Sequence, residues 1–157
     1  MDYRIREMRR QEYGLLEDFL YEAIFVPEGV KAPPKTITAV PELRVYVEGF
    51  GDKEGDAGLV AEMEGKVIGA VWARIMDDYG HLDDETPSLA ISLYKEYRGH
   101  GIGTALMEGI LVLLKERGFA RVSLSVQKDN YAVKMYRRVG FQVVRESEEE
   151  LVMGREL

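Results

Sequence analysis

The 157-residue sequence contains no cysteine and only two histidines, His81 and His100. The absence of cysteine excludes disulfides, zinc sites with thiolate ligands and a cysteine nucleophile. Two histidines are too few for a metal site built from several imidazole ligands, so we expect no bound metal. No apolar run approaches the roughly 18 residues of a membrane span, and residues 1–6 lack the apolar segment of a signal peptide. These absences favour a cytoplasmic protein and argue against a membrane partner.

Positive charge is also in short supply. Aspartate and glutamate number 28 against 21 lysines and arginines, which gives a net charge of −7 at pH 7. Because nucleic-acid binding needs clustered basic residues, this balance argues against a nucleic-acid partner. Basic residues do gather between positions 95 and 138, which suits a small polyanionic ligand. A solvated helix face explains Arg137 and Arg138 equally well.

Hydrophobic residues nonetheless make up 46% of the chain, which is enough for a sizeable core. The length suits a single domain over residues 1–157. The spacing of apolar residues predicts the element order β-α-α-β-β-β-α-β-α-β-β, with an acidic loop at residues 77–85. This order indicates an α/β fold, more closely an α+β mixed sheet with helices on its faces. Strands are expected at residues 3–6, 59–63, 67–75, 89–93, 122–126, 141–145 and 151–154, and helices at 10–25, 41–49, 102–117 and 130–139.

The most informative motif lies between the strand at 89–93 and the helix at 102–117. Its three glycines at alternate positions allow positive φ angles and a close approach of a ligand to the backbone. The helix start that follows offers unpaired N–H groups and the positive end of its dipole. The motif therefore predicts a phosphate cradle, and its spacing fits neither a Walker A loop nor a Rossmann turn. A glycine-rich connection without a ligand is the alternative. The motif reads Arg98-Gly99-His100-Gly101-Ile102-Gly103-Thr104.

The flanking polar residues of this loop have expected roles of their own. Arg98 at its mouth would add charge-assisted hydrogen bonds to a phosphate. Thr104 would add a hydroxyl, or would cap the helix instead. His100 is expected to be a loop residue that faces solvent.

The loop resembles the Arg/Gln-x-x-Gly-x-Gly/Ala motif of the GNAT superfamily of N-acetyltransferases. Residues 130–141 resemble the second motif of that superfamily, Asn-x-x-Ala-x-x-x-Tyr-x-x-x-Gly-Phe, with the alanine one place earlier. The resemblance implies a mostly antiparallel twisted sheet, a splayed strand pair at the cofactor site and acetyl-CoA as the cofactor. It also implies backbone contacts from Ile91 and Leu93 to the pantetheine arm. The full set of expected coenzyme contacts is Ile91, Leu93, Arg98, Gly99, His100, Gly101, Ile102, Gly103, Thr104, Asn130, Ala132 and Tyr136.

Residues of the second motif have simpler alternatives. Asn130 is expected to cap the helix at 130–139 and to contact the pantetheine arm, and Asp129 competes for the cap. Ala132 is small where a cofactor would pass, but ordinary helix packing explains it equally well. Tyr136 is the expected general acid, because the resemblance places it near the coenzyme sulfur and a phenol can protonate the leaving thiolate. A half-buried aromatic with another partner is the alternative.

A general base is harder to assign. An alkyl ammonium has a pKa of about 10.4, so a group must take its proton before attack. Glu22 in the first helix and Glu85 in the acidic loop are the main candidates. The acidic loop adds Asp83, Asp84 and His81 as further candidates. Each of the carboxylates also suits an ordinary surface position.

The expected activity is transfer of an acetyl group from acetyl-CoA to a primary amine of a small molecule or peptide, by direct attack in a ternary complex. A non-catalytic module that binds CoA or acyl-CoA is the first alternative, and a nucleotide-phosphate binder is the second. Where the branch that acetylates protein N-termini has a glutamate, this chain has Ser125, which disfavours that role. Monomer and homodimer both remain open. Candidate acceptor-pocket residues are Trp72, Tyr21, Phe25 and Tyr79, with core packing the alternative for Trp72 and Phe25.

Overall fold

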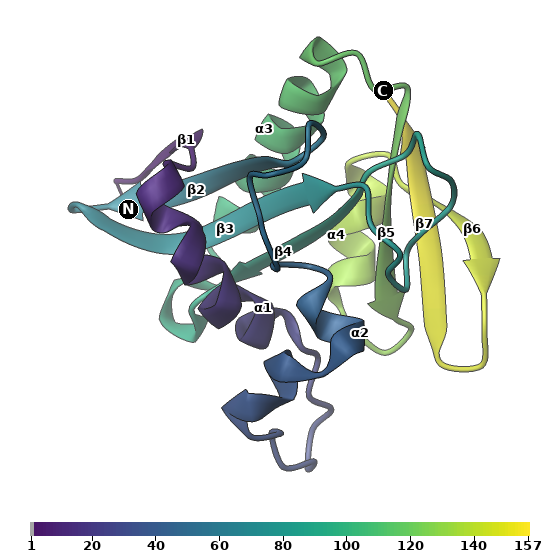
Figure 1. The fold of residues 1–157 in the computed structure, drawn as a ribbon. Coiled ribbons are helices and arrows are strands. Elements are labelled where there is room, and N and C mark those ends of the chain that lie inside the picture. The colour runs from purple at the N-terminus through teal and green to yellow at the C-terminus, as the bar shows by residue number, and fades with distance from the viewer. Residues whose placement is uncertain (1) are drawn as a thin grey trace.

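The computed structural model describes residues 2–157 and places seven strands in one sheet, in the order β1-β2-β3-β4-β5-β7-β6 (Figure 1). All neighbouring strands are antiparallel except β4 and β5. Every expected strand is present, with ends that differ by one or two residues. The bounds are β1 (Arg4–Glu7), β2 (Ala57–Met63), β3 (Lys66–Arg74), β4 (Ser88–Leu93), β5 (Arg121–Gln127), β6 (Gln142–Glu146) and β7 (Glu150–Glu156).

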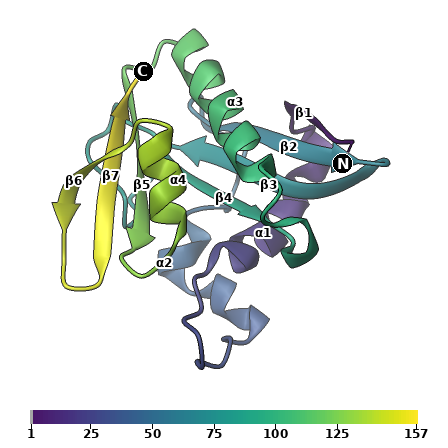
Figure 2. The same ribbon diagram turned by 180° about the vertical axis from the view of Figure 1, so that it is seen from behind.

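Helices cover both faces of this sheet, which confirms the mixed α/β fold. One face carries α1 (Leu16–Ala23) and α2 (Pro41–Arg44), in front in Figure 1. The other carries α3 (Ile102–Glu116) and α4 (Ala132–Arg138), in front in Figure 2. Because successive strand residues point to opposite faces, the sheet separates two hydrophobic cores. Val71 belongs to the core under α3, and its neighbour Trp72 to the core under α1.

The first two helices are shorter than expected. The helix predicted at 10–25 begins as a 3-10 helix (Arg10–Leu15), in which the Glu12 N–H donates to the Arg9 carbonyl at 2.9 Å. This i to i+3 bond tightens the chain before α1 begins. The helix predicted at 41–49 ends at Arg44. Arg74 of β3 donates to the carbonyls of Val45 and Glu48 at 3.2 and 2.7 Å, and these contacts favour turns over a longer helix.

An ion-pair network fastens β1 to the start of the 3-10 helix and to β2. The Arg6 guanidinium contacts both carboxylate oxygens of Glu12 at 2.9 and 2.7 Å, and it contacts Glu62 at 3.0 Å. The side chains of Arg6 and Glu12 are each only 14% exposed. The hydrogen bond from Arg6 lowers the pKa of Glu12 to about 2, from an ordinary value of 4.5.

We expect Glu12→Gln to lower the free energy of unfolding at pH 7 by about 1–2 kcal/mol, after allowance for solvent screening of this partly buried pair. Because the folded-state pKa is depressed, the contribution is present above pH 4.5 and is lost as the pH falls toward 2. Urea denaturation at pH 7 and pH 3 checks this, with the exposed Glu116→Gln as the control. Equal losses of stability on acidification in the wild type and Glu12→Gln would contradict it.

Candidate active site

The strands β4 and β5 separate soon after they meet. Their only paired residues are Ser88 and Ser123, and the Ser123 N–H donates to the Pro87 carbonyl at 3.0 Å. The other edge of β4 stays paired with β3 from Ser88 to Leu93. The sheet is therefore open between β4 and β5, as Figure 1 shows, and the expected splayed strand pair is present.

The splay leaves backbone groups of β4 without a strand partner. The Tyr94 N–H donates to Ile68 of β3, whereas the Pro87 carbonyl faces β5. Because backbone groups alternate sides along a strand, the odd-numbered residues Leu89, Ile91 and Leu93 turn their N–H and C=O groups toward the gap. The carbonyl of Leu93 accepts a hydrogen bond from Arg98 at 2.9 Å. Leu89 is absent from the sequence-based set, although the same alternation identifies it.

A cleft of about 210 Å³ lies at this gap. Its walls come from β4, β5, the C-terminal end of α1, the segment around α2, and α4. Leu89 and Ile91 of β4 and Ser125 and Gln127 of β5 are among the residues that line it. Among the described residues that line the cleft there is no lysine or arginine, and Glu150 lies at its wall. The cleft therefore suits a ligand part that carries positive charge.

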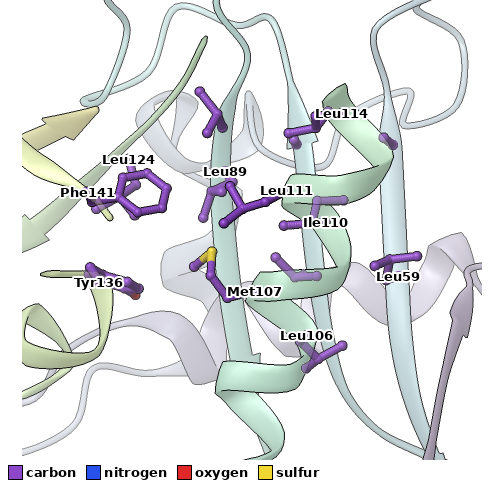
Figure 3. Close-up of a cluster of buried hydrophobic side chains, with 14 of the residues drawn as sticks. Leu59, Leu89, Leu106, Met107, Ile110, Leu111, Leu114, Leu124, Tyr136 and Phe141 are labelled. Atoms are coloured by element: carbon purple, nitrogen blue, oxygen red, sulfur yellow. The ribbon is translucent and has the colours of Figure 1, made fainter. Parts of the chain in front are cut away.

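Tyr136 lines this cleft from α4. Figure 3 shows its side chain extending from α4 toward Met107 of α3, and its ring packs at 6.2 Å from that of Phe141. The residue is 8% exposed. Burial raises the pKa of Tyr136 to about 12, so the phenol stays protonated at neutral pH and can donate its proton.

The glycine loop ends in an open helix start. Gly99 and Gly101 have φ angles of 81° and 83°, and no heavy atom lies within 4 Å of a Cβ built at either position. Gly101 is the N-cap of α3, and no side chain caps this helix. The first N–H groups of the helix, from Ile102 to Thr104, therefore have neither an intrahelical acceptor nor a side-chain cap. This arrangement can receive a phosphate through the backbone.

Other loop residues differ in what they present. The side chain of Ile102 is fully buried, so only its backbone can reach a ligand. Thr104 lies inside the first turn of α3 and does not cap it. His100 is exposed, as expected. Gly103 sits close to Leu93, whose Cδ1 lies 3.9 Å from a Cβ built on the glycine.

Arg98 turns away from the loop mouth. Its Nη2 donates to the carbonyl and to the carboxylate of Glu22, both at 3.2 Å, and its Nε donates to Leu93. The negative end of α1 together with a carboxylate attracts the guanidinium there. Arg98 as a phosphate ligand stays a prediction, and it requires the side chain to leave these contacts. Glu22 is held by Arg98 and does not line the cleft.

The structure does not bring the other expected bases to the cleft. Glu85 is exposed outside it. Asp83 pairs with Arg121 at 2.8 Å, and Asp84 lies 3.4 Å from Nε2 of His81. The loop is fastened to β5, since the Ser123 hydroxyl donates to the Gly80 carbonyl at 2.7 Å. Together with the pair of Asp83 and Arg121, this contact ties the loop to the N-terminal part of β5.

Asn130 and the aromatic candidates divide between the cleft and the core. Tyr131 is the N-cap residue of α4, one position after the expected cap, but the Asn130 side chain accepts a hydrogen bond from the Ala132 N–H at 2.9 Å. Asn130 also lines the cleft. Ala132 packs against the core. Phe25 and Tyr79 line the cleft as expected. Trp72 and Tyr21 do not: Trp72 is fully buried, and the Tyr21 hydroxyl donates to the Pro33 carbonyl at 2.5 Å.

A polar group that sequence reasoning missed lies beside the cleft. Tyr46, just after α2, lines it and is 7% exposed. The Tyr46 hydroxyl is close enough to Asp78 and Ser125 for both to affect its pKa. Oδ1 of Asp78 accepts a hydrogen bond from the Ser88 hydroxyl at 2.7 Å. No local pattern marks Tyr46, and Asp78 looks like one more charge of the acidic loop.

Two further properties concern the described residues as a whole. Within residues 2–157, no helix has the length and apolar character required to cross a bilayer. The same residues contain no group of three or more histidine, aspartate or glutamate side chains arranged to hold a metal ion.

The fold occurs in known acetyltransferase structures. The paia N-acetyltransferase from Thermoplasma acidophilum, solved in complex with coenzyme A, superposes with a TM-score of 0.73 over the full length of both chains at 17% identity. The yncA protein from Salmonella typhimurium, solved with acetyl-CoA, gives a TM-score of 0.73 over 100% of this chain and 95% of that one at 15% identity. At these identities the likeness shows a shared fold.

Sequence relatives point the same way. An N-alpha-acetyltransferase from Sulfurisphaera tokodaii is 34% identical over 119 residues, which cover 68% of this chain and 70% of that protein. The probable N-acetyltransferase camello from Xenopus tropicalis is 38% identical over 87 residues, and the chain spans only about two fifths of its length. The family model described as "Acetyltransferase (GNAT) family" matches residues 18–141, which include the splayed strands, the glycine loop and α4. The chain therefore belongs to the acetyltransferase (GNAT) family.

Proposed function

We propose that this protein transfers an acetyl group from acetyl-CoA to a primary amine of a small molecule or peptide, by direct attack in a ternary complex. The observation that carries the proposal is the open edge of β4, which leads through the 3-10 helix Lys95–Tyr97 and the glycine loop to the uncapped start of α3. Solved neighbours of the same fold hold coenzyme A or acetyl-CoA, which supports the donor.

The donor would bind mainly to backbone groups. The N–H groups from Ile102 to Thr104 would receive the pyrophosphate, since nothing caps them and no side chain fills the space at Gly99 and Gly101. The free backbone groups of Leu89 and Ile91 match the amides of the pantetheine arm. When bound, acetyl-CoA supplies an acetyl thioester that is already activated for attack by an amine. Tyr136 would protonate the departing thiolate.

The acceptor would occupy the remainder of the cleft. Glu150 lines it, and Glu42 and Glu150 both lie near enough to Tyr79 to add to the rise that burial causes in the pKa of Tyr79. This negative charge, with no basic residue in the described lining, suits a protonated amine. The N-alpha-acetyltransferase relative supports a peptide N-terminus, and Ser125 in place of a glutamate supports another amine.

Thiol release from acetyl-CoA tests the proposal. The acceptor panel would hold small amines, polyamines, a peptide with a free N-terminus and a blocked peptide with one lysine, with calorimetry of CoA binding in parallel. We expect binding of CoA, no competition from ATP, and thiol release with at least one class of amine. Binding of CoA together with no thiol release for all of the amines tested would favour the non-catalytic regulatory module. Failure of CoA to bind would overturn the donor site.

Gly101→Ala tests the phosphate cradle. An added Cβ would stand in the open space before the α3 N–H groups, so we expect CoA affinity to fall by about tenfold. Gly118→Ala is the matched control, because Gly118 also has a positive φ, of 90°, with open space around its Cβ, but lies at the other end of α3. Each alanine should cost about 1–2 kcal/mol of stability through backbone strain. Calorimetry measures the CoA affinity of both variants. Equal losses of CoA affinity in Gly101→Ala and Gly118→Ala would contradict the assignment of the phosphate cradle.

A further inference from the structure

We propose that Tyr46 is the catalytic residue that takes the proton from the acceptor amine, and that Asp78 is the positioning residue that receives it through the Tyr46 hydroxyl. This inference rests on the proposed function. It supplies the base that Glu22 and Glu85 do not provide in this structure.

The backbone around Tyr46 is held from several sides. Its carbonyl accepts a hydrogen bond from the Trp72 indole at 2.9 Å, and its N–H donates to the Leu43 carbonyl at 3.1 Å. The Arg74 guanidinium holds the carbonyls of Val45 and Glu48 on either side. These contacts fix a side chain that lines the same cleft as Tyr136 and Ile91. Tyr46 therefore borders the cleft that the acceptor amine would occupy under the proposed function.

Asp78, which is near the Tyr46 hydroxyl, has an unusual carboxylate oxygen. Oδ1 is held by the Ser88 hydroxyl, but Oδ2 is buried and receives no hydrogen bond of ordinary geometry from the described residues. The Tyr46 hydroxyl and the Gly80 N–H are nonetheless close enough to the carboxylate to lower the Asp78 pKa. A buried acceptor without a donor is costly, so such an atom calls for an explanation. Proton uptake through the neighbouring Tyr46 hydroxyl provides that explanation, because Oδ2 then carries an O–H group and is no longer a charged acceptor without a donor.

The surroundings of the pair favour this direction of transfer. Burial raises the pKa of Asp78, and this rise outweighs the lowering by the Ser88 hydroxyl, the Tyr46 hydroxyl and the Gly80 N–H. The higher pKa makes the carboxylate a better base at neutral pH. Burial, with the charge of Asp78 and of Tyr79, raises the pKa of Tyr46, and Ser125 opposes that rise. Tyr46 therefore passes a proton on and does not ionise itself.

The step is balanced in atoms and charge. An N–H bond of the acceptor ammonium breaks, its proton binds the Tyr46 oxygen, and the Tyr46 proton moves to Oδ2 of Asp78. The ammonium and the carboxylate both become neutral, so the net charge of the cleft is unchanged. The free electron pair of the amine then forms the C–N bond to the acetyl carbon as the C–S bond breaks. The nitrogen loses a second proton, the departing sulfur gains one, and Asp78 later returns its proton to water.

Asp78→Asn and Tyr46→Phe test the assignment, with the exposed neighbour Asp77→Asn as the matched control. For the best acceptor amine at pH 7, we expect kcat/KM to fall by about a hundredfold in the first two variants and to stay unchanged in Asp77→Asn. The loss should shrink toward pH 10 and for amines of low pKa, because a neutral amine needs no base. CoA affinity and melting temperature are measured on every variant, and infrared spectroscopy of the wild type should show a buried carboxyl that titrates above the ordinary aspartate range and is missing in Asp78→Asn.

The outcomes separate the two proposals. Thiol release by the wild type with an unchanged kcat/KM in Asp78→Asn and Tyr46→Phe would overturn the proton route alone. A loss that is equal at every pH and for every amine would also overturn it, because it would show a merely structural role. If the wild type fails to release thiol with every amine of the panel, the proposed function fails and the proton route fails with it.

Discussion

Tyr136→Phe is expected to lower turnover of acetyl-CoA with an amine by several hundredfold, within the range that a positioned general acid contributes. The variant keeps the ring that packs against Phe141 and removes only the hydroxyl of a residue that lines the cleft. Because most of the expected phosphate and pantetheine contacts are backbone groups of β4 and the glycine loop, CoA affinity should stay within about twofold. Steady-state kinetics and calorimetry measure the two quantities.

The pH dependence gives this prediction a second readout. Burial raises the pKa of Tyr136 to about 12, so its proton is present throughout the accessible range and the wild type should show no alkaline loss of activity from this residue below pH 10. Tyr131→Phe is the matched control, since Tyr131 lies just before α4 and is 74% exposed. Unchanged turnover in Tyr136→Phe would remove the residue from the mechanism.

Arg74→Met is expected to lower the free energy of unfolding by about 3–5 kcal/mol, because it leaves Asp56 buried without its charge partner. Both side chains are only 1% exposed, and the guanidinium contacts the two carboxylate oxygens at 3.1 and 3.0 Å. The variant also frees the carbonyls of Val45 and Glu48. Urea denaturation measures the stability.

The exposed pair of Arg121 and Asp83 provides the comparison. Its contact is shorter, at 2.8 Å, but the side chains are 34% and 47% exposed. Water already solvates these charges, so Arg121→Met should cost less than about 1 kcal/mol. Similar losses in Arg74→Met and Arg121→Met would show that burial does not control the strength of these pairs.

Local features of the sequence were sufficient for the fold and for part of the site. The alternation of apolar residues predicted all seven strands, and the glycines before residue 102 predicted an open helix start. The Asn130 side chain binds a backbone N–H at the start of α4, as its chemistry suggests, although the helix begins one residue later than a cap at Asn130 requires. Each of these features depends on residues that are neighbours along the chain, so spacing alone carries the information. The two motifs led to the family for the same reason.

Only the tertiary structure decided which polar side chains meet. Arg98 and Glu22 are 76 positions apart, and folding pairs them with each other, a contact that neither motif predicts. Arg74 ends a predicted helix early by taking carbonyls 26 and 29 positions away. Tyr46 and Asp78 approach each other only because α2 and the acidic loop pack beside the open edge of β4. Hydrogen bonds and ion pairs form wherever packing brings partners together, and that placement has no counterpart in local spacing.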